Sequence, residues 1–436
     1  MGLLLRDAGA TPGYGQALDF LFRRTTGAVR LGLDHTRRLL AELGDPHLGL
    51  RSVHVAGTNG KGSTAATLEA LLRARGLRVG KYTSPHLVDF RERIVVDGVP
   101  MPGDDVVGFV ETHLAAIERT EATFFEVTTA MALEHFARSG ADIAVIETGL
   151  GGRLDSTNVV MPLAAVVTTI GLDHTEYLGP TLRDIAREKA GIFKPGVPAV
   201  VGEPDAEVAG WLAAHALDAR ACEVRVLRSE GWPADIEVGP EGTSFTLGGP
   251  VGEGARFHTP LVGRHQAANT ATALLALDAL GTDYALEPAE RRAALENVRV
   301  PGRFERAGRF IFDVAHNPDG AEVLTRTLSA VRVPRPLAAV VCVLADKDWR
   351  AMLSRLAPHV DVLVLTQAPT APANRAWDPV EAAAFAASQG WAAILQPDFD
   401  AAIERAATEG ATVLVTGSFH TVGDAMARLP AAPAAG

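Results

Sequence analysis

Cysteine is scarce in this sequence of 436 residues, where only Cys222 and Cys342 occur. Two distant cysteines cannot form a disulfide framework, and they make neither a C-x-x-C metal site nor a redox motif. We interpret both side chains as packing residues. This composition favours the reducing cytoplasm as the location of the protein.

Long apolar runs and an excess of positive charge are also absent. No segment approaches the roughly 18 consecutive apolar residues of a membrane helix, and residues 1–7 reach a charge pair too early for a secretory signal. The formal net charge of −11 argues against a nucleic-acid-binding protein, which usually carries a basic face. We therefore predict no membrane partner and no nucleic-acid partner.

What the chain does contain is alternating strand-like and helix-like segments. The pattern predicts an α/β fold: a P-loop ATP-binding domain with a mainly parallel sheet, plus a smaller C-terminal Rossmann-like α/β domain. We expect the domains to cover residues 1–295 and 300–436, with a hinge over 292–301. Predicted strands are 53–56, 143–146, 164–169, 199–201, 309–314, 337–344, 361–365, 392–395 and 412–416. Predicted helices are 104–117, 125–138 and 181–189, with a long amphipathic one at 266–280 after a small β-rich excursion at 223–262.

A glycine-rich turn stands between a predicted strand and a predicted helix at residues 56–63, Ala-Gly-Thr-Asn-Gly-Lys-Gly-Ser. Its glycines let backbone N–H groups approach phosphate oxygens, the helix N-terminus adds partial positive charge, and Lys61 can reach the β- and γ-phosphates. The spelling differs from the common G-x-x-x-x-G-K-[ST] loop, because Val55 replaces the first glycine and Gly62 separates Lys61 from Ser63. We predict that this loop binds a nucleoside triphosphate.

Further polar motifs follow the ends of other predicted strands. Ligands of an open α/β sheet collect beyond the carboxyl ends of its strands, so segments spread over 130 residues can converge at one edge. The motifs are Thr-Ser-Pro-His-Leu at 83–87, Glu-Thr-Gly-Leu-Gly-Gly-Arg-Leu-Asp at 147–155, Asp-His-Thr at 173–175, Glu-Lys-Ala-Gly-Ile at 188–192, Pro-Gly-Arg-Phe-Glu at 301–305 and Asp-Val-Ala-His-Asn-Pro at 313–318.

Taken together, these motifs resemble the folylpolyglutamate synthase/dihydrofolate synthase branch of the Mur ligase superfamily, over nearly the whole chain from about residue 31 to about 426. The resemblance implies ATP-dependent ligation of L-glutamate to dihydropteroate and to folate polyglutamates through an acyl phosphate. It also implies a monomer. Two readings stay open: a P-loop nucleotide switch or phosphotransferase, and a peptidoglycan-type amide ligase. The sequence leaves undecided whether one or both family activities are present.

The resemblance also implies roles for individual residues. It assigns catalytic roles to Lys61, His174, Lys189 and Arg303. ATP would be held by Gly57, Thr58, Asn59, Gly60, Lys61, Gly62, Ser63, Asn269, Arg303, Asp313 and His316. A first Mg²⁺ would be bound by Ser84, Glu147 and His174, and a second by Lys189 as a carbamate. Thr123, Phe125 and Asp155 would bind the pterin, and Ser418 and His420 are weaker candidates on the glutamate side.

Each of these residues also has a purely structural interpretation. Ser84 and His174 could be turn residues, Glu147 a solvated strand end, and Lys189 a surface lysine favoured by the helix C-terminus. Arg303 could pair with Glu305. Phe125 could be a core ring, and Asp155 could cap a turn with Asn158.

Overall fold

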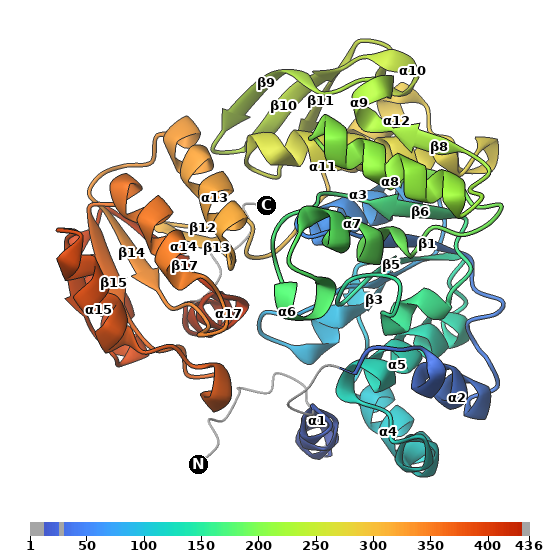
Figure 1. The fold of residues 1–436 in the computed structure, drawn as a ribbon, viewed down its shortest axis with the longest axis horizontal. Coiled ribbons are helices and arrows are strands. Elements are labelled where there is room, and N and C mark those ends of the chain that lie inside the picture. The colour runs from blue at the N-terminus through green and yellow to red at the C-terminus, as the bar shows by residue number, and fades with distance from the viewer. Residues whose placement is uncertain (1–12, 26–29, 430–436) are drawn as a thin grey trace.

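The computed structural model describes residues 13–25 and 30–429. The start of the predicted domain 1–295 and the end of the predicted domain 300–436 therefore lie outside the described residues. The protein has two α/β units side by side, the larger formed by the first two-thirds of the chain and the smaller by the last third (Figure 1). Among the described residues, no helix is long and apolar enough to cross a membrane.

An eight-stranded sheet organises the larger unit. Its order is β4-β3-β2-β5-β1-β6-β7-β8, and only the hairpin strands β3 and β4 run antiparallel to their neighbours. The strands are β1 (Ser52–Ala56), β2 (Val79–Tyr82), β3 (Ile94–Val96), β4 (Val99–Pro100), β5 (Ile143–Glu147), β6 (Ala164–Val167), β7 (Ala199–Val201) and β8 (Val224–Val226).

Apolar side chains on both faces of this sheet explain why its strands are continuous hydrophobic runs. In β5, Ile143 and Val145 pack in one core while Ala144 and Ile146 pack in the opposite one. Two groups of helices cover these cores and account for the helix-period segments between strands. They are α3 (Lys61–Ala74), α11 (Arg264–Ala279) and α12 (Pro288–Leu295) on one side and α1 (Tyr14–Arg23), α2 (Asp34–Glu42), α4 (Gly103–Thr120) and α5 (Phe124–Arg138) on the other.

A small antiparallel sheet lies on top of the larger unit in Figure 1, in the order β11-β10-β9. Its strands are β9 (Ala234–Gly239), β10 (Gly242–Leu247) and β11 (Ala255–Thr259). Phe245 and Phe257 pack into the same core as α3 and α11. The predicted β-rich excursion is confirmed, except that its first strand, β8, joins the main sheet instead.

The predicted amphipathic character of α11 is wrong. Its buried residues include Gln266, Asn269, Thr270 and nearly all of its alanines and leucines. Because the main sheet covers one side of this helix and the small sheet another, it has no broad solvated face.

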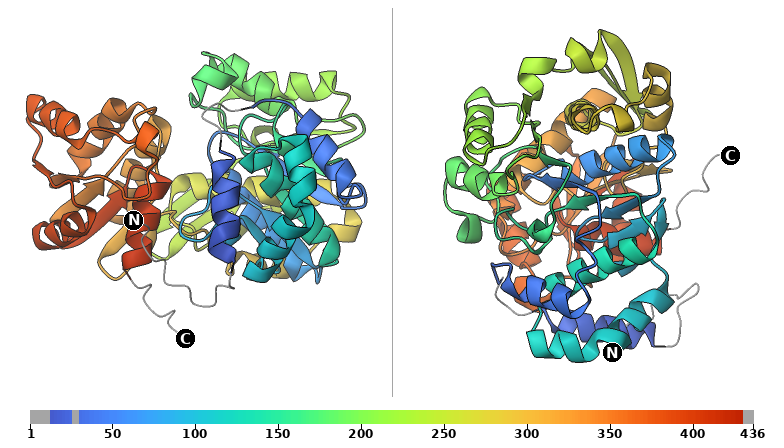
Figure 2. Two further views of the ribbon diagram at one scale, coloured as in Figure 1. Left: turned by 90° about the horizontal axis from the view of Figure 1, so that it is seen from below. Right: turned by 90° about the vertical axis from the view of Figure 1, so that its right-hand side faces the viewer.

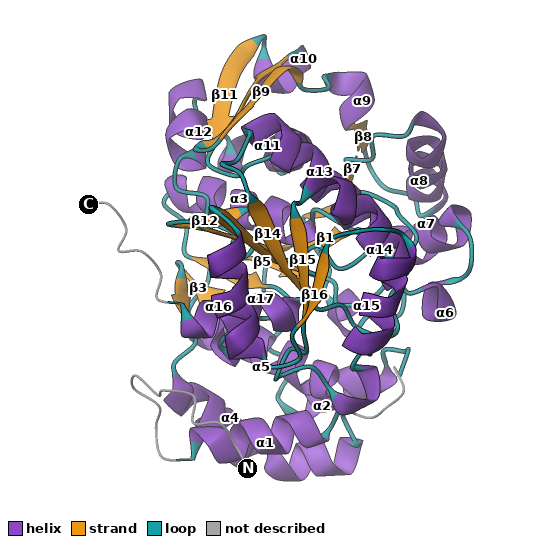
Figure 3. Ribbon diagram, turned by 90° about the vertical axis from the view of Figure 1, so that its left-hand side faces the viewer, coloured by secondary structure: helices purple, strands orange, loops and turns teal. Residues whose placement is uncertain are grey.

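The smaller unit contains a six-stranded sheet in the order β12-β13-β17-β14-β15-β16, parallel except for the edge strand β12. Helices α13, α14 and α15 lie on one side of β14–β16, and α16 and α17 on the other (Figure 3). The strands are β12 (Glu305–Ala307), β13 (Phe310–Asp313), β14 (Leu337–Val341), β15 (Val362–Leu365), β16 (Ala393–Leu395) and β17 (Thr412–Thr416). The helices are α13 (Pro318–Val331), α14 (Trp349–Leu356), α15 (Pro379–Ser388), α16 (Phe399–Glu409) and α17 (Phe419–Arg428).

The connection between the units is shorter than the predicted hinge. Helix α12 continues to Leu295, so residues 292–295 belong to the first unit and the connection begins at Glu296. The left-hand view of Figure 2 shows the two units as separate bodies side by side. The predicted strands 164–169 and 337–344 also end early, at Val167 and Val341. After Val167 the chain leaves the sheet, and residues 169–171 line the interdomain cavity.

Candidate active site

A cavity of about 390 Å³ lies between the two units, at the carboxyl ends of their parallel strands. The structure brings most of the predicted site residues together on its walls. Those of the first unit are Gly57–Ser63, Ser84, Glu147, His174, Lys189 and Asn269, and those of the second are Arg303, Asp313 and His316.

The glycine-rich loop is shaped for close backbone contacts. Gly57 and Gly60 have φ values of 153° and 87°, which favour glycine. A Cβ on Gly57 would lie 1.8 Å from the hydroxyl of Thr168, and one on Gly60 would lie 2.4 Å from Oδ1 of Asn269. Helix α3 begins at Lys61, so its free N–H groups point towards the cavity.

Lys61 folds back over its own loop. Its Nζ donates to the carbonyl oxygens of Gly57 at 3.0 Å and Thr58 at 3.2 Å, and lies 3.9 Å from Oε1 of Glu147. Glu147 ends β5 and is only 4% exposed. Burial raises the pKa of its carboxyl, while the charges of Lys61 and Arg303 oppose that rise. A carboxylate in this setting is stabilised by any further cation that enters the cavity.

His174 is held in a left-handed conformation, with φ 51°, after the turn that follows β6. Burial and then the charge of Lys347 lower the pKa of its imidazole to about 4. The ring is therefore neutral at pH 7, which is the form that binds metal ions.

The neighbouring Asp173 crosses between the units. Its Oδ1 lies 2.6 Å from Nζ of Lys347, and both side chains are buried. Its Oδ2 accepts from Asn317 at 3.2 Å and lies 3.7 Å from His316. Burial alone would raise the pKa of Asp173, but the close approach of His316 and the charge of Lys347 hold it well below its ordinary value.

Lys347 and Asn317 were missed as site residues. Asn317 stands inside a quoted motif, and Lys347 lies in Leu-Ala-Asp-Lys-Asp-Trp at 344–349. The second segment follows the predicted strand 337–344, and its position after a strand end is the signal that could have found it.

Lys189 points into the first unit. Its Nζ donates to the carbonyl oxygen of Gly57 at 2.8 Å, so the end of α7 (Leu182–Ala190) is tied to the start of the phosphate loop. Burial and then the charge of Lys61 lower the pKa of the amine to about 7. A substantial fraction of Lys189 is consequently neutral at physiological pH.

The residues present fit a hard divalent cation. Glu147 offers a buried carboxylate, Ser84 a hydroxyl and His174 a neutral imidazole, all on the wall of the same cavity. Such oxygen-rich sets, completed by water, suit Mg²⁺ or Mn²⁺. Within residues 13–25 and 30–429, no group of three or more histidine, cysteine or acidic side chains is placed to hold a metal ion by itself.

Arg303 reaches the cavity from the connection between the units. Its guanidinium stacks over the ring of Phe419, 5.3 Å from the centroid. Burial lowers its pKa, while the charges of Asp313 and Glu147 oppose that shift. Asp313 is itself fixed, because it accepts the backbone N–H of Phe304 at 3.0 Å and of Ala315 at 2.9 Å.

The three predicted pterin residues do not line this cavity. Thr123 caps α5 in a reciprocal arrangement with Glu126. Phe125 lies against Gly149, where an added Cβ would come within 2.3 Å of its ring. Asp155 is buried and accepts the N–H of Leu150 at 2.7 Å and of Thr157 at 3.0 Å. Phe125 and Asp155 thus support residues 149–151, which do line the cavity.

Ser418 and His420 also lie behind the wall of the cavity, on either side of Phe419. Ser418 caps α17 by accepting the N–H of Thr421 at 3.1 Å. His420 shares a hydrogen bond of 3.0 Å with the hydroxyl of Thr370.

Comparison with known families gives two matches that divide the chain in the same way as its sheets. Residues 55–277 match the Mur ligase middle domain, and residues 302–419 match the Mur ligase glutamate ligase domain. Each match covers the part of the chain that supplies one wall of the cavity.

Several characterised proteins are similar over almost the full chain. The dihydrofolate synthase/folylpolyglutamate synthase of Bacillus subtilis is 33% identical over 428 residues, covering 95% of this chain and 99% of the relative. The corresponding Escherichia coli protein is 38% identical over 415 residues, covering 94% of each.

Solved structures with ligands are similar in fold. Folylpolyglutamate synthase of Mycobacterium tuberculosis, complexed with ADP, superposes with a TM-score of 0.87 at 33% identity, covering 96% of this chain and 99% of that one. Escherichia coli FolC in complex with DHPP and ADP gives 0.82 at 35% identity, covering 96% and 97%. A bifunctional relative with Mn, AMPPNP and L-glutamate bound gives 0.80 at 33% identity, covering 94% and 97%.

Proposed function

The chain belongs to the dihydrofolate synthase/folylpolyglutamate synthase family of Mur ligases and is an ATP-dependent glutamate ligase, and we propose from this premise how its own residues carry the reaction. The family membership excludes a nucleotide switch, a phosphotransferase and a peptidoglycan ligase. The proposal rests on one observation. The phosphate loop, Glu147, Lys189 and Arg303 face a single cavity whose walls come from both units.

The reaction begins with two anions that repel each other, the terminal carboxylate of the pteroate or folate and the γ-phosphate of ATP. Positive groups held in place lower that repulsion, and they do so most where negative charge develops on the phosphoryl group in the transition state. In our proposal Lys61 and the N–H groups of the phosphate loop hold the phosphates, and Arg303 approaches the γ-phosphate from the opposite wall. The resulting acyl phosphate is attacked by the amine of L-glutamate, and ADP and phosphate leave.

Asn269, Asp313 and His316 are proposed to contact the nucleotide, since all three line the cavity. Thr123, Phe125 and Asp155 remain proposed pterin residues. Phe125 and Asp155 contact residues 149 and 150, which line the cavity, and this proximity to the site supports the proposal for these two residues. Dihydropteroate, reduced folates and L-glutamate are the proposed substrates of this chain.

Ser84, Glu147 and His174 are proposed to bind a first Mg²⁺, and Lys189, as a carbamate, to bind a second. These ions would neutralise phosphate charge. The low pKa of Lys189 supports the carbamate, because CO₂ adds only to a neutral amine. The chain is further proposed to act as a monomer in the cytoplasm. Its proposed domains cover residues 1–295 and 300–436, since each unit has its own sheet and core.

ADP release with different acceptors tests the proposed substrates. We expect ADP to form only when L-glutamate and an acceptor are both present, with 7,8-dihydropteroate and with tetrahydrofolate as separate acceptors. Turnover of tetrahydrofolate alone would reduce the proposal to the polyglutamylating activity. ADP release independent of any acceptor would contradict acyl phosphate formation as the coupled step.

Replacing Arg303 by alanine should lower kcat far more than it raises the apparent KM for ATP. The guanidinium comes from the connection between the units, so it acts on the γ-phosphate only when the cavity is closed, in the transition state. We expect a loss in kcat of about 100-fold or more, the usual effect of removing one such charge. Steady-state kinetics with ATP varied would make this comparison, and a change confined to KM would make Arg303 a ground-state nucleotide contact.

A further inference from the structure

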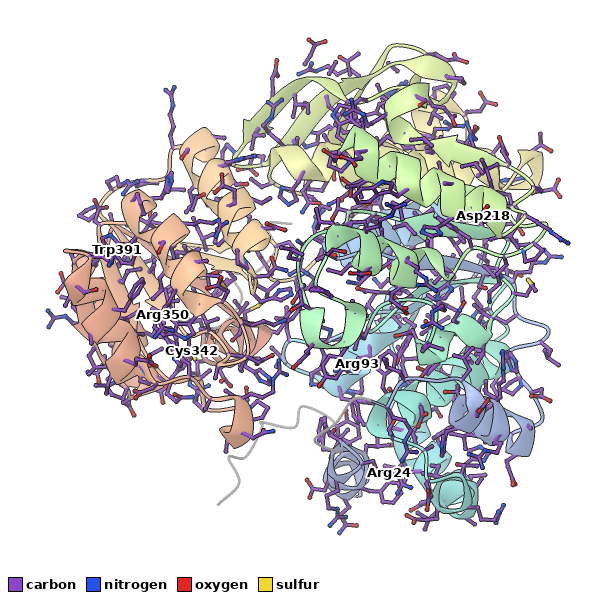
Figure 4. All side chains as sticks on the ribbon, viewed as in Figure 1. Arg24, Arg93, Asp218, Cys342, Arg350 and Trp391 are labelled. Atoms are coloured by element: carbon purple, nitrogen blue, oxygen red, sulfur yellow. The ribbon has the colours of Figure 1, made fainter. Side chains whose placement is uncertain are left out.

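Arg93 is a buried arginine with unused hydrogen-bonding capacity. It ends the short helix η1 (Phe90–Arg93) and is 7% exposed. Figure 4 labels it in the lower half of the larger unit. Its Nε donates to Nδ1 of His86 at 2.7 Å, and no described residue places a carboxylate within ion-pair distance of the guanidinium. The two terminal NH₂ groups have no protein acceptor among the described residues, and neither is sealed from solvent.

The acidic neighbours of Arg93 in the sequence form no ion pair with it, because their carboxylates are engaged elsewhere. The carboxylate of Glu92 accepts the backbone N–H groups of Leu87, Val88 and Asp89 at 2.8, 3.0 and 2.8 Å. Asp89 forms an ion pair with Arg91 at 2.6 Å. A buried charge without a counter-ion is costly, and it is retained where a ligand supplies that counter-ion.

Aromatic rings form a wall beside this charge. The guanidinium carbon lies 5.2 Å from the centroid of Phe124, and Phe22 stacks on Phe124 at 5.3 Å. Phe22 keeps 42% of its surface exposed, so one side of this wall faces solvent.

The wall adjoins the reaction cavity through one turn. The carbonyl oxygen of Arg93 accepts the N–H of Thr83 at 3.0 Å, and the next two residues, Ser84 and Pro85, line the cavity. A group bound at Arg93 would therefore lie next to the turn whose residues Ser84 and Pro85 line the cavity.

The two acceptor substrates differ in the groups that they could offer to this site. Dihydropteroate has one carboxylate, on its aryl ring, and that carboxylate reacts. A folate carries a glutamate whose γ-carboxylate reacts while its α-carboxylate stays free. We propose that Arg93, with the Phe22–Phe124 wall, binds the free α-carboxylate of the terminal glutamate of a folate acceptor. This inference rests on the proposed function and makes Arg93 a specificity-determining residue for polyglutamate extension.

Substrate-dependent kinetics test the assignment. Arg93→Gln should raise the KM for tetrahydrofolate about 10- to 100-fold, the usual effect of losing a hydrogen bond to a charged group, and change that for dihydropteroate less than about twofold. Arg93→Lys, which keeps the charge but loses the planar fork, should recover part of the loss. Arg119→Gln is the matched control, because Arg119 pairs only with exposed Glu42, and it should leave both KM values unchanged.

A modified acceptor separates recognition from structural damage. Wild-type protein should bind tetrahydrofolate more tightly than its α-carboxamide analogue in calorimetric titration, whereas Arg93→Gln should bind both equally. Equal losses for tetrahydrofolate and dihydropteroate, or unchanged discrimination against the amide, would overturn the assignment. Absence of wild-type turnover with either acceptor would instead refute the proposed substrates.

Discussion

Replacing Lys61 by alanine should abolish glutamate ligation while leaving the fold intact. Loop shape is set by Gly57 and Gly60, whose conformations do not depend on the lysine, and α3 is held by its buried leucines. Lys61 places the loop's mobile positive charge beside Glu147. Since electrostatic groups of this kind contribute about 10²–10³ in kcat each, we expect a loss of at least that size in ADP formation.

The control for this variant lies on the same helix. Arg73→Ala removes an exposed charge from the last turn of α3, far from the cavity, and should keep wild-type turnover. Thermal unfolding should give similar midpoints for both variants. Near-normal ligation by Lys61→Ala would mean that the loop's backbone alone binds the phosphates.

Replacing Lys189 by alanine should cause a comparably severe loss, which short-chain carboxylates restore in part. The wild-type amine has a pKa lowered to about 7, so burial favours its neutral form in the folded protein. The neutral fraction rises as the pH rises through about 7, and carbamylation should follow it. At limiting bicarbonate, activity is therefore expected to fall as the pH drops below this value.

Carbon NMR with ¹³C-bicarbonate would detect the carbamate directly, and the signal should disappear in Lys189→Ala. Lys194→Ala is a demanding control. The pKa of Lys194 is also lowered, by burial, to about 8, but this amine donates to carbonyl oxygens of Asn158 and Val160 outside the cavity. Its removal should leave the carbamate signal in place. A wild-type spectrum without that signal would contradict the second metal ligand.

Local sequence determined most of the fold and much of the site. The apolar segments that form strands and the residues that form the phosphate loop are each contiguous in the sequence. Strands β7 (Ala199–Val201) and β17 (Thr412–Thr416) appear at their predicted positions. The convergence of Ser84 and Glu147 also followed from sequence, because parallel strands end at one edge of a sheet.

Features that depend on the packing of distant segments could not be predicted. The pairing of Asp173 with Lys347 requires the relative position of the two units, which no periodicity encodes. The sequence of α11 predicts an amphipathic helix, and only the structure shows that the small sheet covers the side expected to face solvent. The sequence alone would pair Arg93 with Glu92 or Asp89. Only the structure shows that these two carboxylates bind other groups and that no described residue forms an ion pair with Arg93.

Because Asp173 contacts the second unit, the cation binding that we propose for the neighbouring His174 would be thermodynamically linked to the attachment of that unit. The loop that carries His174 is fastened by its neighbour to Lys347 and Asn317, so a ligand that repositions the histidine also acts on the attachment of the second unit. Linkage is reciprocal. A cation that strengthens the attachment would itself be bound more tightly, by the same factor, when the second unit is attached. Since the Asp173–Lys347 pair is buried, added salt should screen this coupling only weakly.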